Sequence, residues 1–299
     1  MAWDEARVHV LTHTLHYGLG VFEGIRCYKC NDGRSAIFRL REHVERLCDS
    51  ARILALKSPY GIDEISAACL ATIRANGLEE CYIRPLLYLG SGEMGLAAPS
   101  NPVCLSIAVW PWGSYLGEEG LAKGIRVKTS SFQRFHVNTL MTKAKAVGHY
   151  VNSILASLEA RNGGYDEALL LDVDGYAAEG CGENLFIVRN GVVKTTPVAT
   201  ILDGITRASA IDLLAARGVK VVEERFTRDE VYIADEAFFT GTAAEITPIA
   251  SLDDRPIGNG RPGALTQQLQ EDYFAVIRGE NQSATAAVPL PDRDWLTYL

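Results

Sequence analysis

Long apolar runs are missing from this sequence of 299 residues. No stretch approaches the roughly 20 consecutive apolar residues that a membrane-spanning helix needs. The first residues, Met1 to Arg7, also lack the basic start and the apolar stretch of a secretory signal peptide. We therefore expect a protein that has no membrane partner, and we predict a cytoplasmic location.

Clustered positive charge is missing as well. The net charge is -8 and the isoelectric point is near 5.3, and no part of the chain gathers Lys and Arg into a basic face. A protein that binds a nucleic-acid backbone needs such a face, so we exclude nucleic acid as a partner. No Walker loop occurs, and we find no support for a nucleotide cofactor.

The cysteines and histidines do not form a disulfide framework or a metal motif. Seven cysteines, an odd number, are scattered along the chain, as is typical of small buried side chains. Cys27 and Cys30 form a C-x-x-C pair, for which packing is favoured over a zinc site or a redox pair. His9, His13 and His16 lie on a segment that is not one helix, so we predict no metal site.

The sequence does contain enough apolar residues to form the cores of two domains. In the first part, residues 1–111, period-two and period-3.6 patterns predict a small α+β domain. The predicted strands are Arg7–Leu11, Leu19–Tyr28, Ser35–Arg39, Tyr82–Gly90 and Pro102–Pro111, and the predicted helices are Glu42–Leu56 and Asp63–Asn76. Residues 112–124, with four glycines, are expected to form an interdomain loop.

The second part, residues 125–279, is expected to form a larger domain with a mixed sheet, which makes the whole fold α+β or mixed α/β. Its predicted strands are Arg126–Ser130, Asp166–Asp172, Asn184–Arg189, Val192–Thr195, Lys220–Arg225 and Ala237–Thr240. Asn190-Gly191 predicts a hairpin turn. Residues 280–299 lack periodicity and are expected to be a loose extension.

Two helices are predicted in this second part. The first follows Tyr150, and the apolar side chains at i, i+3, i+4 and i+7 are expected to be its buried face. These residues are Val151, Ile154, Leu155 and Leu158. The second helix is Arg207–Arg217, with Thr206 as its N-cap and Gly218 just after its end.

Lys143 and Lys145 flank one alanine just before the first of these helices. A solvated basic turn is one interpretation of this pair. The other is that one amine acts as a nucleophile toward carbonyl groups, which requires burial or a nearby cation to lower its pKa. The residues alone leave both interpretations open.

Three turns that contain glycine are further candidates for binding or catalytic sites. Glu179 and Glu183 alternate with glycines, which let the backbone fold tightly against a ligand; glycosidase chemistry or a metal site would also use two carboxylates, but the spacing is not diagnostic. The turn 203–207 opens a helix whose N-terminus suits a phosphate, or is an ordinary capped end. The turn 240–245 is a second candidate anion cradle, or only a tight turn.

Taken in order, these segments resemble the branched-chain aminotransferases, which belong to the class IV, pyridoxal-phosphate-dependent aminotransferases of fold type IV. The likeness runs from Arg7 to Gly279, and the pairing of Phe-Glu-Gly-Ile-Arg with Tyr-Ile-Arg-Pro resembles the branch that acts on branched-chain L-amino acids. The matching segments are Tyr17–Arg26, Arg46-Leu47, Tyr82–Pro85, Lys145, Glu179–Phe186, Gly204–Arg207 and Gly241–Thr247.

The resemblance implies pyridoxal 5′-phosphate as cofactor and gives each candidate a role. Lys145 forms the Schiff base and moves the substrate proton, while Lys143 is a structural neighbour. Glu179 pairs with the pyridine nitrogen so that the ring can accept electrons, Glu183 supports it, and Tyr150 bonds the 3′ oxygen. The phosphate-binding groups implied are Arg46, the backbone of Ile205 and Thr206, and the Thr242 hydroxyl.

The implied substrates are branched-chain L-amino acids and 2-oxo acids, which exchange an amino group with 2-oxoglutarate and glutamate by a ping-pong mechanism. Arg84 admits the second carboxylate of glutamate. The groups implied for the α-carboxylate are Tyr82, Thr242 and Ala243, and those for the side-chain pocket are Tyr17, Phe22, Trp112 and Tyr115. The resemblance also implies that the interdomain loop orders over bound substrate.

The resemblance further implies a homodimer, or a hexamer assembled from such dimers, because the loop Met94-Gly95-Leu96 reaches the partner's site. Two features depart from relatives. Val147 and His149 stand where relatives have Gly and Asn, and the N-terminus starts later. Rival interpretations are a D-amino-acid or (R)-amine aminotransferase, an aminodeoxychorismate-type lyase, a noncatalytic cofactor-binding relative, and an interaction protein without a small-molecule site.

Overall fold

The first of two sheets collects strands from both ends of the chain. The computed structural model describes residues 3–98, 100–113, 115–280 and 294–299. Within them, the strand order is β1-β4-β2-β3-β15, with β5 on the other side of β4, and every pairing is antiparallel. These strands are β1 Gly20–Phe22, β2 Ile25–Lys29, β3 Ser35–Phe38, β4 Cys81–Leu89, β5 Val103–Trp110 and β15 Leu296–Tyr298.

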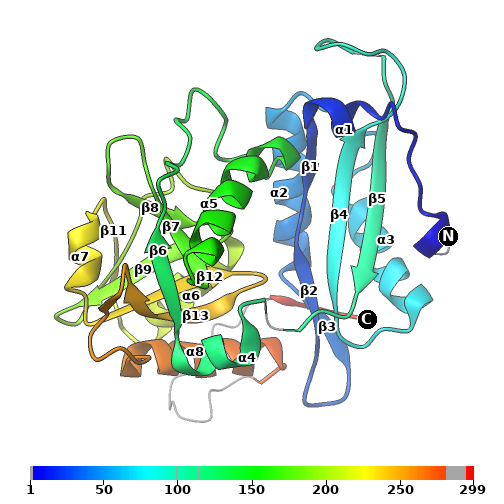
Figure 1. Ribbon diagram of the computed structural model, residues 1–299. Helices are drawn as coiled ribbons and strands as arrows, with labels where there is room; N and C mark the ends of the chain where they lie inside the picture. The colour runs from blue at the N-terminus through cyan, green and yellow to red at the C-terminus, as the bar shows by residue number, and fades with distance from the viewer. Residues whose placement is uncertain (1–2, 99, 114, 281–293) are drawn as a thin grey trace.

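Two helices, α2 (Leu40–Ile53) and α3 (Ile62–Asn76), cover one face of this sheet (Figure 1). Leu40, Val44 and Leu47 recur at helical spacing on α2 and are buried, so the apolar stripe of the helix faces the sheet. Together with Ile65 and Ile73 of α3 they form one core cluster with the strands.

The second sheet mixes parallel and antiparallel strands, in the order β11-β10-β9-β12-β13-β6-β7-β8 with β14 beside β13. An extra pairing of β8 with β9, at Glu179 and Asn184, joins two strands at distant places in this order. Its strands are β6 Ile125–Thr129, β7 Glu167–Leu171, β8 Ala177–Gly180, β9 Asn184–Arg189, β10 Val192–Thr195, β11 Val221–Glu223, β12 Glu236–Gly241, β13 Glu245–Leu252 and β14 Arg255–Pro256.

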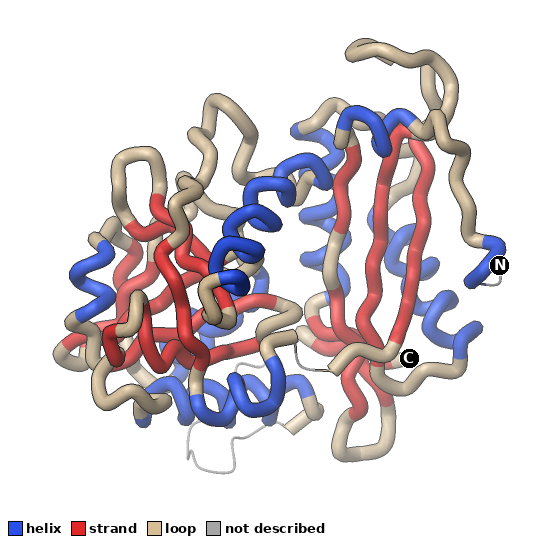
Figure 2. The backbone as a smooth tube through the Cα atoms, viewed as in Figure 1, coloured by secondary structure: helices blue, strands red, loops and turns tan. Residues whose placement is uncertain are grey.

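Helices pack around this second sheet, and Figure 2 shows the two strand-rich bodies side by side. Phe186, Phe238 and Tyr273 form the centre of the core between the sheet and two of the helices. The helices of this part are α4 Gly117–Lys123, α5 Tyr150–Asn162, α6 Ile205–Ala216, α7 Arg228–Tyr232 and α8 Ala264–Ile277; the short η1 Trp3–Glu5, α1 His13–Tyr17 and η2 Val147–His149 complete the set within the described residues.

Most predicted elements are present with small shifts of their ends. The hairpin at Asn190-Gly191 is confirmed, with both residues at positive φ between β9 and β10. The strand predicted at residues 7–11 was wrong, because this segment has no ladder in the structure. The stretch predicted as one strand at 19–28 is two strands, β1 and β2, separated at Glu23-Gly24.

The helix α6 begins earlier than predicted. Its N-cap is Gly204, and the N–H of Ala208 donates to the Gly204 carbonyl. Thr206 therefore lies inside the first turn, and the prediction that it caps the helix was wrong. Gly218, at a φ of +73°, follows the helix end as predicted.

The predicted buried face of α5 was also wrong. Val151, Ile154, Leu155 and Leu158 are all exposed. The helix packs on β7 through its small side chains, with Ser153, Ala156 and Ala160 buried, because small residues let helix and sheet approach closely. The helical period was correct, but period alone does not tell which of two stripes is buried.

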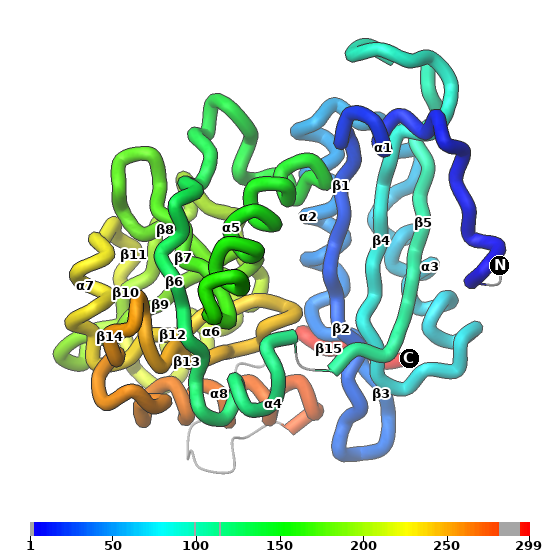
Figure 3. The backbone as a smooth tube through the Cα atoms, viewed as in Figure 1, coloured from blue at the N-terminus to red at the C-terminus, as the bar shows by residue number. Residues whose placement is uncertain are grey.

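Both segments expected to be without structure contain elements. The interdomain loop 112–124 includes α4, and the C-terminal extension returns to the first sheet, where β15 pairs with β3. Figure 3 shows this red terminal strand beside the blue strands of the N-terminal part. The boundaries of the two domains, 1–111 and 125–279, remain a prediction.

Other expectations concern absent features. Across the described ranges, no helix is long and apolar enough to cross a membrane; the cytoplasmic location stays a prediction. Within the same ranges, no three His, Cys, Asp or Glu side chains gather as a metal site. All seven cysteines are free, and the cross-strand neighbour of Cys27 is Cys81, not Cys30.

Candidate active site

A cavity of about 430 Å³ lies between the two sheets and receives side chains from both. Its volume is in the range of small-molecule sites. Most of the predicted site residues line it: Phe22, Arg46, Tyr82, Arg84, Trp112, Tyr115, Lys145, Tyr150, Glu179, Ile205, Thr206, Thr242 and Ala243. Residues more than 200 positions apart in the sequence therefore meet at one place.

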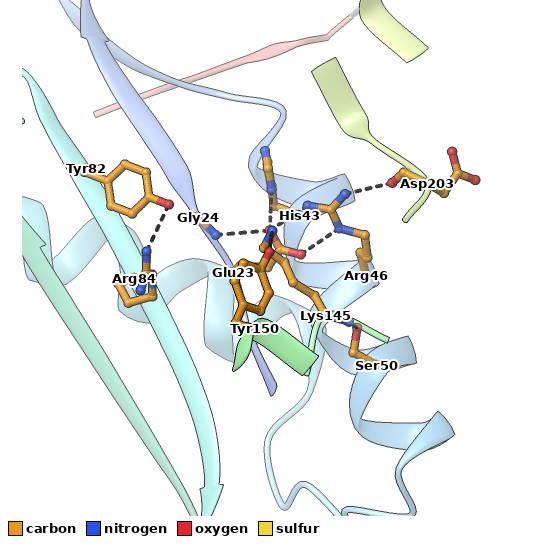
Figure 4. A network of polar contacts seen from close by, with 10 residues as sticks. All are labelled: Glu23, Gly24, His43, Arg46, Ser50, Tyr82, Arg84, Lys145, Tyr150 and Asp203. Carbon is orange, nitrogen blue, oxygen red and sulfur yellow. Dashed lines mark hydrogen bonds and ion pairs between the residues drawn. The ribbon is translucent and has the colours of Figure 1, made fainter. Parts of the chain in front are cut away.

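Lys145 is held by its backbone at the edge of β1. Its carbonyl accepts the N–H of Phe22 at 3.0 Å, and its own N–H donates to Ser50 Oγ at 3.0 Å. The side chain enters the cavity, where Nζ lies 2.9 Å from Tyr150 Oη. These contacts fix the amine at one position in the cavity wall (Figure 4).

The surroundings of Lys145 act on its pKa in opposite directions. Burial lowers the pKa, but Tyr150 and the carboxylate of Glu23 outweigh burial and raise it above the ordinary value. Lys143 differs, because its Nζ donates to the carbonyl of Val198 outside the cavity, and burial lowers its pKa. Only one of the two lysines therefore faces the cavity.

A buried ionic cluster that the sequence analysis missed stands behind Lys145. The carboxylate of Glu23 is fully buried and accepts two bonds from Arg46, at 2.7 and 2.9 Å. His43 Nδ1 lies 2.7 Å from the same carboxylate. Burial alone would raise the pKa of Glu23, but Arg46 and His43 hold it well below its usual range.

Arg46 uses two nitrogen atoms to bind Glu23, and its third, Nη1, points toward the start of α6. Arg46 Nη1 donates to the carbonyl of Asp203 at 2.8 Å, and no described side chain caps the helix at Gly204. The first N–H groups of a helix have no partner within it and attract anions. Ile205 and Thr206 line the cavity here, so a cation and a free helix end converge on one corner.

Gly204 leaves no room for a side chain in that corner. A Cβ on Gly204 would lie 1.9 Å from Asn184 Oδ1. Asn184 in turn donates to the Leu202 carbonyl at 3.0 Å. The close approach of these segments fixes the position of the helix start.

Glu179 stands elsewhere in the cavity wall, on β8. Its Oε1 lies 2.5 Å from Arg134 Nε, but neither atom has a well-aligned hydrogen bond within the described chain. Its Oε2 accepts weak contacts from Asn184 and Leu202, at 3.4 and 3.3 Å. Burial raises the pKa of Glu179, and Arg134 opposes this only in part. The carboxylate is thus buried with unused acceptor capacity.

Arg134 is a cavity residue that no motif pointed to. Its guanidinium lies 4.0 Å from the centre of the Phe135 ring, and His149 packs on the same ring at 5.0 Å. His149 lines the cavity too. Burial lowers the pKa of His149, and the positive charge of Arg134 lowers it further. A spacing rule could not find Arg134, because it lies on an irregular segment 45 positions before Glu179.

Glu183 belongs to a second group of buried acids. Burial, with repulsion from Glu167, raises its pKa well above the ordinary value. Glu167 is fully buried on β7, and burial raises its pKa as well. Burial thus makes both carboxyl groups easier to protonate than a glutamate in water.

Aromatic rings form the wall contributed by β4 and the segment after β5. Trp112 meets Tyr82 edge to face at 4.5 Å, and Tyr115 lies 5.8 Å from Trp112. The guanidinium of Arg84 lies over the Phe22 ring at 4.7 Å and donates to Tyr82 Oη at 3.2 Å. This wall is apolar with one cation, so it can contact an aliphatic side chain or a carboxylate.

Four predicted site residues do not reach this cavity in the described chain. Tyr17 is 43% exposed on α1, and Leu96 is 89% exposed. Met94 and Gly95 lie on the same projecting loop between β4 and β5, which stands away from the body of the molecule in Figure 1. The placement of Tyr17 in this chain's own pocket is therefore not supported.

Comparison with known proteins agrees with this geometry. Residues 20–252 match the family Amino-transferase class IV. The branched-chain-amino-acid aminotransferase of Pseudomonas aeruginosa is 55% identical over 281 residues, which cover 94% of this chain and 91% of that protein. The Escherichia coli enzyme of the same name is 46% identical over 282 residues, with 94% and 91% covered. The chain belongs to the branched-chain aminotransferases of class IV.

Solved structures give the same family and confirm the predicted fold. The crystal structure of the Escherichia coli branched-chain aminotransferase aligns with a TM-score of 0.94 at 44% identity, covering 99% of this chain and 95% of that one. The Thermobaculum terrenum enzyme, solved in its PLP-form, aligns with a TM-score of 0.90 at 37% identity, covering 100% and 95%. The predicted resemblance is therefore confirmed at the level of family and fold.

Proposed function

We propose that this aminotransferase moves amino groups between branched-chain L-amino acids and 2-oxoglutarate by a ping-pong mechanism, with pyridoxal 5′-phosphate as cofactor. The observation that carries the proposal is the convergence of Lys145, Glu179 and Arg46 on one cavity. An amine, a buried carboxylate and an anion-binding corner are the groups that this cofactor needs. The names of the relatives support the choice of substrate.

The unused polar atoms of the cavity fit the cofactor. Glu179 Oε1, which lies beside Arg134 without an aligned hydrogen bond, suits a protonated pyridine nitrogen, and Arg46 with the start of α6 suits a phosphate. The Thr240 hydroxyl, buried without a partner in the described chain, adds a donor to the same cavity, beside Thr242. When bound, the cofactor supplies an electron-withdrawing ring that weakens the bonds at the substrate Cα.

Lys145 and Tyr150 are the groups that act on that carbon. Lys145 Nζ would hold the cofactor, and its free amine would take and return the proton at the substrate Cα. The hydroxyl of Tyr150, 2.9 Å away, keeps the amine in place and is the donor for the 3′ oxygen. Glu23 keeps Arg46 fixed and so holds the phosphate corner while the amine moves.

Substrate recognition falls to the opposite wall. In this proposal Tyr82 Oη, the Thr242 hydroxyl and the backbone of Ala243 bind the α-carboxylate, which is supported by the position of all three residues in the cavity wall. Phe22, Trp112 and Tyr115 contact an aliphatic side chain. Arg84 lies over this aromatic wall and is the cation for the second carboxylate of glutamate. One pocket thus serves both halves of the ping-pong cycle.

The surface supports an assembly of at least two copies. The exposed apolar stripe of α5, Val151, Ile154, Leu155 and Leu158, continues the cavity wall through Ile154 and Leu158. Monomers rarely leave such a patch in water, and Tyr17 and the 94–96 loop lack a site in their own chain. We propose that a second copy covers the stripe, and that Tyr17 and this loop reach its cavity.

Light scattering tests the assembly. Leu155 does not line the cavity, so Leu155→Asp should shift a wild-type dimer toward monomer without changing a side chain of the chain's own cavity wall. A matched exchange at the exposed Val192, away from α5, should leave the mass unchanged. A wild-type protein that is monomeric at micromolar concentration would refute the proposed dimer.

The function is tested by a transamination panel with 2-oxoglutarate as acceptor. Leucine, isoleucine and valine should react, whereas D-alanine and (R)-1-phenylethylamine should not. Preference for the D-amino acid or the amine would refute the substrate assignment but keep the cofactor site. Failure of every donor, with no visible absorption from bound cofactor, would refute the catalytic assignment as well.

The two lysines provide a matched pair for the catalytic role. Lys145→Ala should abolish turnover, and Lys143→Ala should retain most of it, because only Lys145 faces the cavity. The reverse result would transfer the role to Lys143.

A further inference from the structure

Arg26 is a buried cation that forms no direct ion pair in the described chain, although its charge acts on the buried Glu245 and opposes the rise in the pKa of that carboxyl group. It lies on β2, opposite Tyr82 of β4, and is only 5% exposed. All three of its hydrogen bonds go to backbone carbonyl oxygens: Trp112 at 3.4 Å, Gly113 at 2.9 Å and Ala243 at 3.2 Å. A buried charge is costly to desolvate, so a guanidinium that binds only neutral acceptors needs a structural or functional reason.

The three carbonyls belong to two segments that are far apart in sequence. Trp112 and Gly113 lie after β5, at the end of the first sheet, whereas Ala243 lies in the turn between β12 and β13 of the second sheet. Nη2 of Arg26 binds Gly113 and Ala243 together. One nitrogen atom therefore links the two bodies beside the cavity.

Each linked segment carries a wall of the substrate pocket. Trp112 packs against Tyr82, and the turn at Ala243 holds the groups proposed for the α-carboxylate. Two hydrogen bonds hold the backbone of this turn. Arg26 donates to the Ala243 carbonyl, and Thr247 Oγ1 donates to the Ala244 carbonyl at 2.6 Å. Arg26 itself does not line the cavity, so it acts on substrate only through these segments.

The planar guanidinium suits this task better than an ammonium group. It presents several N–H donors in fixed directions, whereas a lysine amine is a flexible point charge. Arg26 Nη1 and Nη2 reach the Trp112, Gly113 and Ala243 carbonyls at once. A lysine at this position can keep the charge but cannot hold both segments with the same geometry.

We propose that Arg26 is a positioning residue for substrate specificity, which sets the spacing between the aromatic wall at Trp112 and the carboxylate-binding turn at Ala243. The inference rests on the proposed role of that turn. Because both walls bind parts of the substrate that do not react, the loss of Arg26 weakens ground state and transition state alike. Such a change appears in KM and leaves kcat largely intact.

The test compares Arg26→Met and Arg26→Lys with wild-type holoenzyme. The best donor of the wild-type panel and 2-oxoglutarate serve as substrates. Arg26→Met should raise both KM values about 10-fold or more, as for loss of a hydrogen bond to a charged group. Arg26→Lys should raise them several-fold, while kcat and cofactor absorption stay near wild type. Arg34→Met, at the exposed β2–β3 turn, should match wild type throughout.

The outcomes separate this inference from the proposed function. An inactive wild type would refute the proposed function, whereas an active wild type with unchanged KM in both Arg26 variants would refute the role of Arg26. A parallel loss of kcat and cofactor absorption without a KM change would also refute it, because it would show a structural role only. If Arg26→Met does not fold, the KM of Arg26→Lys decides alone.

Discussion

Replacing Glu23 by Gln should destabilise the enzyme more than any exchange of a surface carboxylate. Glu23 is fully buried, and its charge is balanced by the guanidinium of Arg46. Burial lowers the pKa of His43 more than Glu23 raises it, so this ring is neutral near pH 7 and adds no second cation. Glu23→Gln therefore leaves one buried positive charge unpaired, which costs about 3–5 kcal/mol.

The exposed pair of Lys29 and Glu79 is a matched control. Its Nζ to Oε1 distance is 2.5 Å, as short as the buried contacts, but the Glu79 side chain is 70% exposed. Exposed pairs contribute about 0–1 kcal/mol. Urea unfolding of wild type, Glu23→Gln and Glu79→Gln should show a large shift of the midpoint only for Glu23→Gln, at a similar slope.

The pH dependence of this difference has a definite sign. The pKa of Glu23 in the folded chain lies below its ordinary value, so its stabilising effect is complete above the pKa of an unfolded glutamate and is lost as the pH falls through the lower folded value. The difference between wild type and Glu23→Gln should stay constant from pH 7 to about 5 and shrink in stronger acid. Equal midpoints for Glu23→Gln and Glu79→Gln would refute the argument.

Two further exchanges test the electrostatics of the cavity. Tyr150→Phe removes the main group that raises the pKa of Lys145 against burial, so the pKa of Lys145 should fall. Cofactor-free Tyr150→Phe should then capture pyridoxal 5′-phosphate at lower pH than wild type. An unchanged pH profile of the capture rate would contradict this. In Glu179→Gln the loss of a charged acceptor, about 1.5–3 kcal/mol, should lower kcat roughly 10- to 150-fold at equal cofactor content, and a kcat like that of wild type would refute the assigned contact.

Local sequence signals were sufficient wherever one pattern decides the structure. Asn190-Gly191 specifies its hairpin because both residues tolerate positive φ, and the helical periodicity of Glu42–Leu56 predicted a helix that is present as α2. The resemblance placed Lys145 and Glu179 on segments that do line one cavity. These positions follow from motifs a few residues long.

Local sequence signals failed where contacts between residues far apart in the sequence decide the structure. Arg134 and the Glu23–His43 contact depend on pairs of segments that only the tertiary fold brings together. The face of α5 was misjudged because the small residues Ala156 and Ala160 are buried against β7, while its larger apolar residues are exposed. The terminal strand is three residues long, too short for any period to show.

That terminal strand has a consequence for handling the protein. The N–H of Leu299 donates to the Ser35 carbonyl at 3.0 Å, and β15 pairs with β3 up to Tyr298. An affinity tag fused after Leu299 would therefore start directly from a hydrogen-bonded sheet edge. A chain shortened to residue 279 would expose the free edge of β3, and such edges recruit other chains.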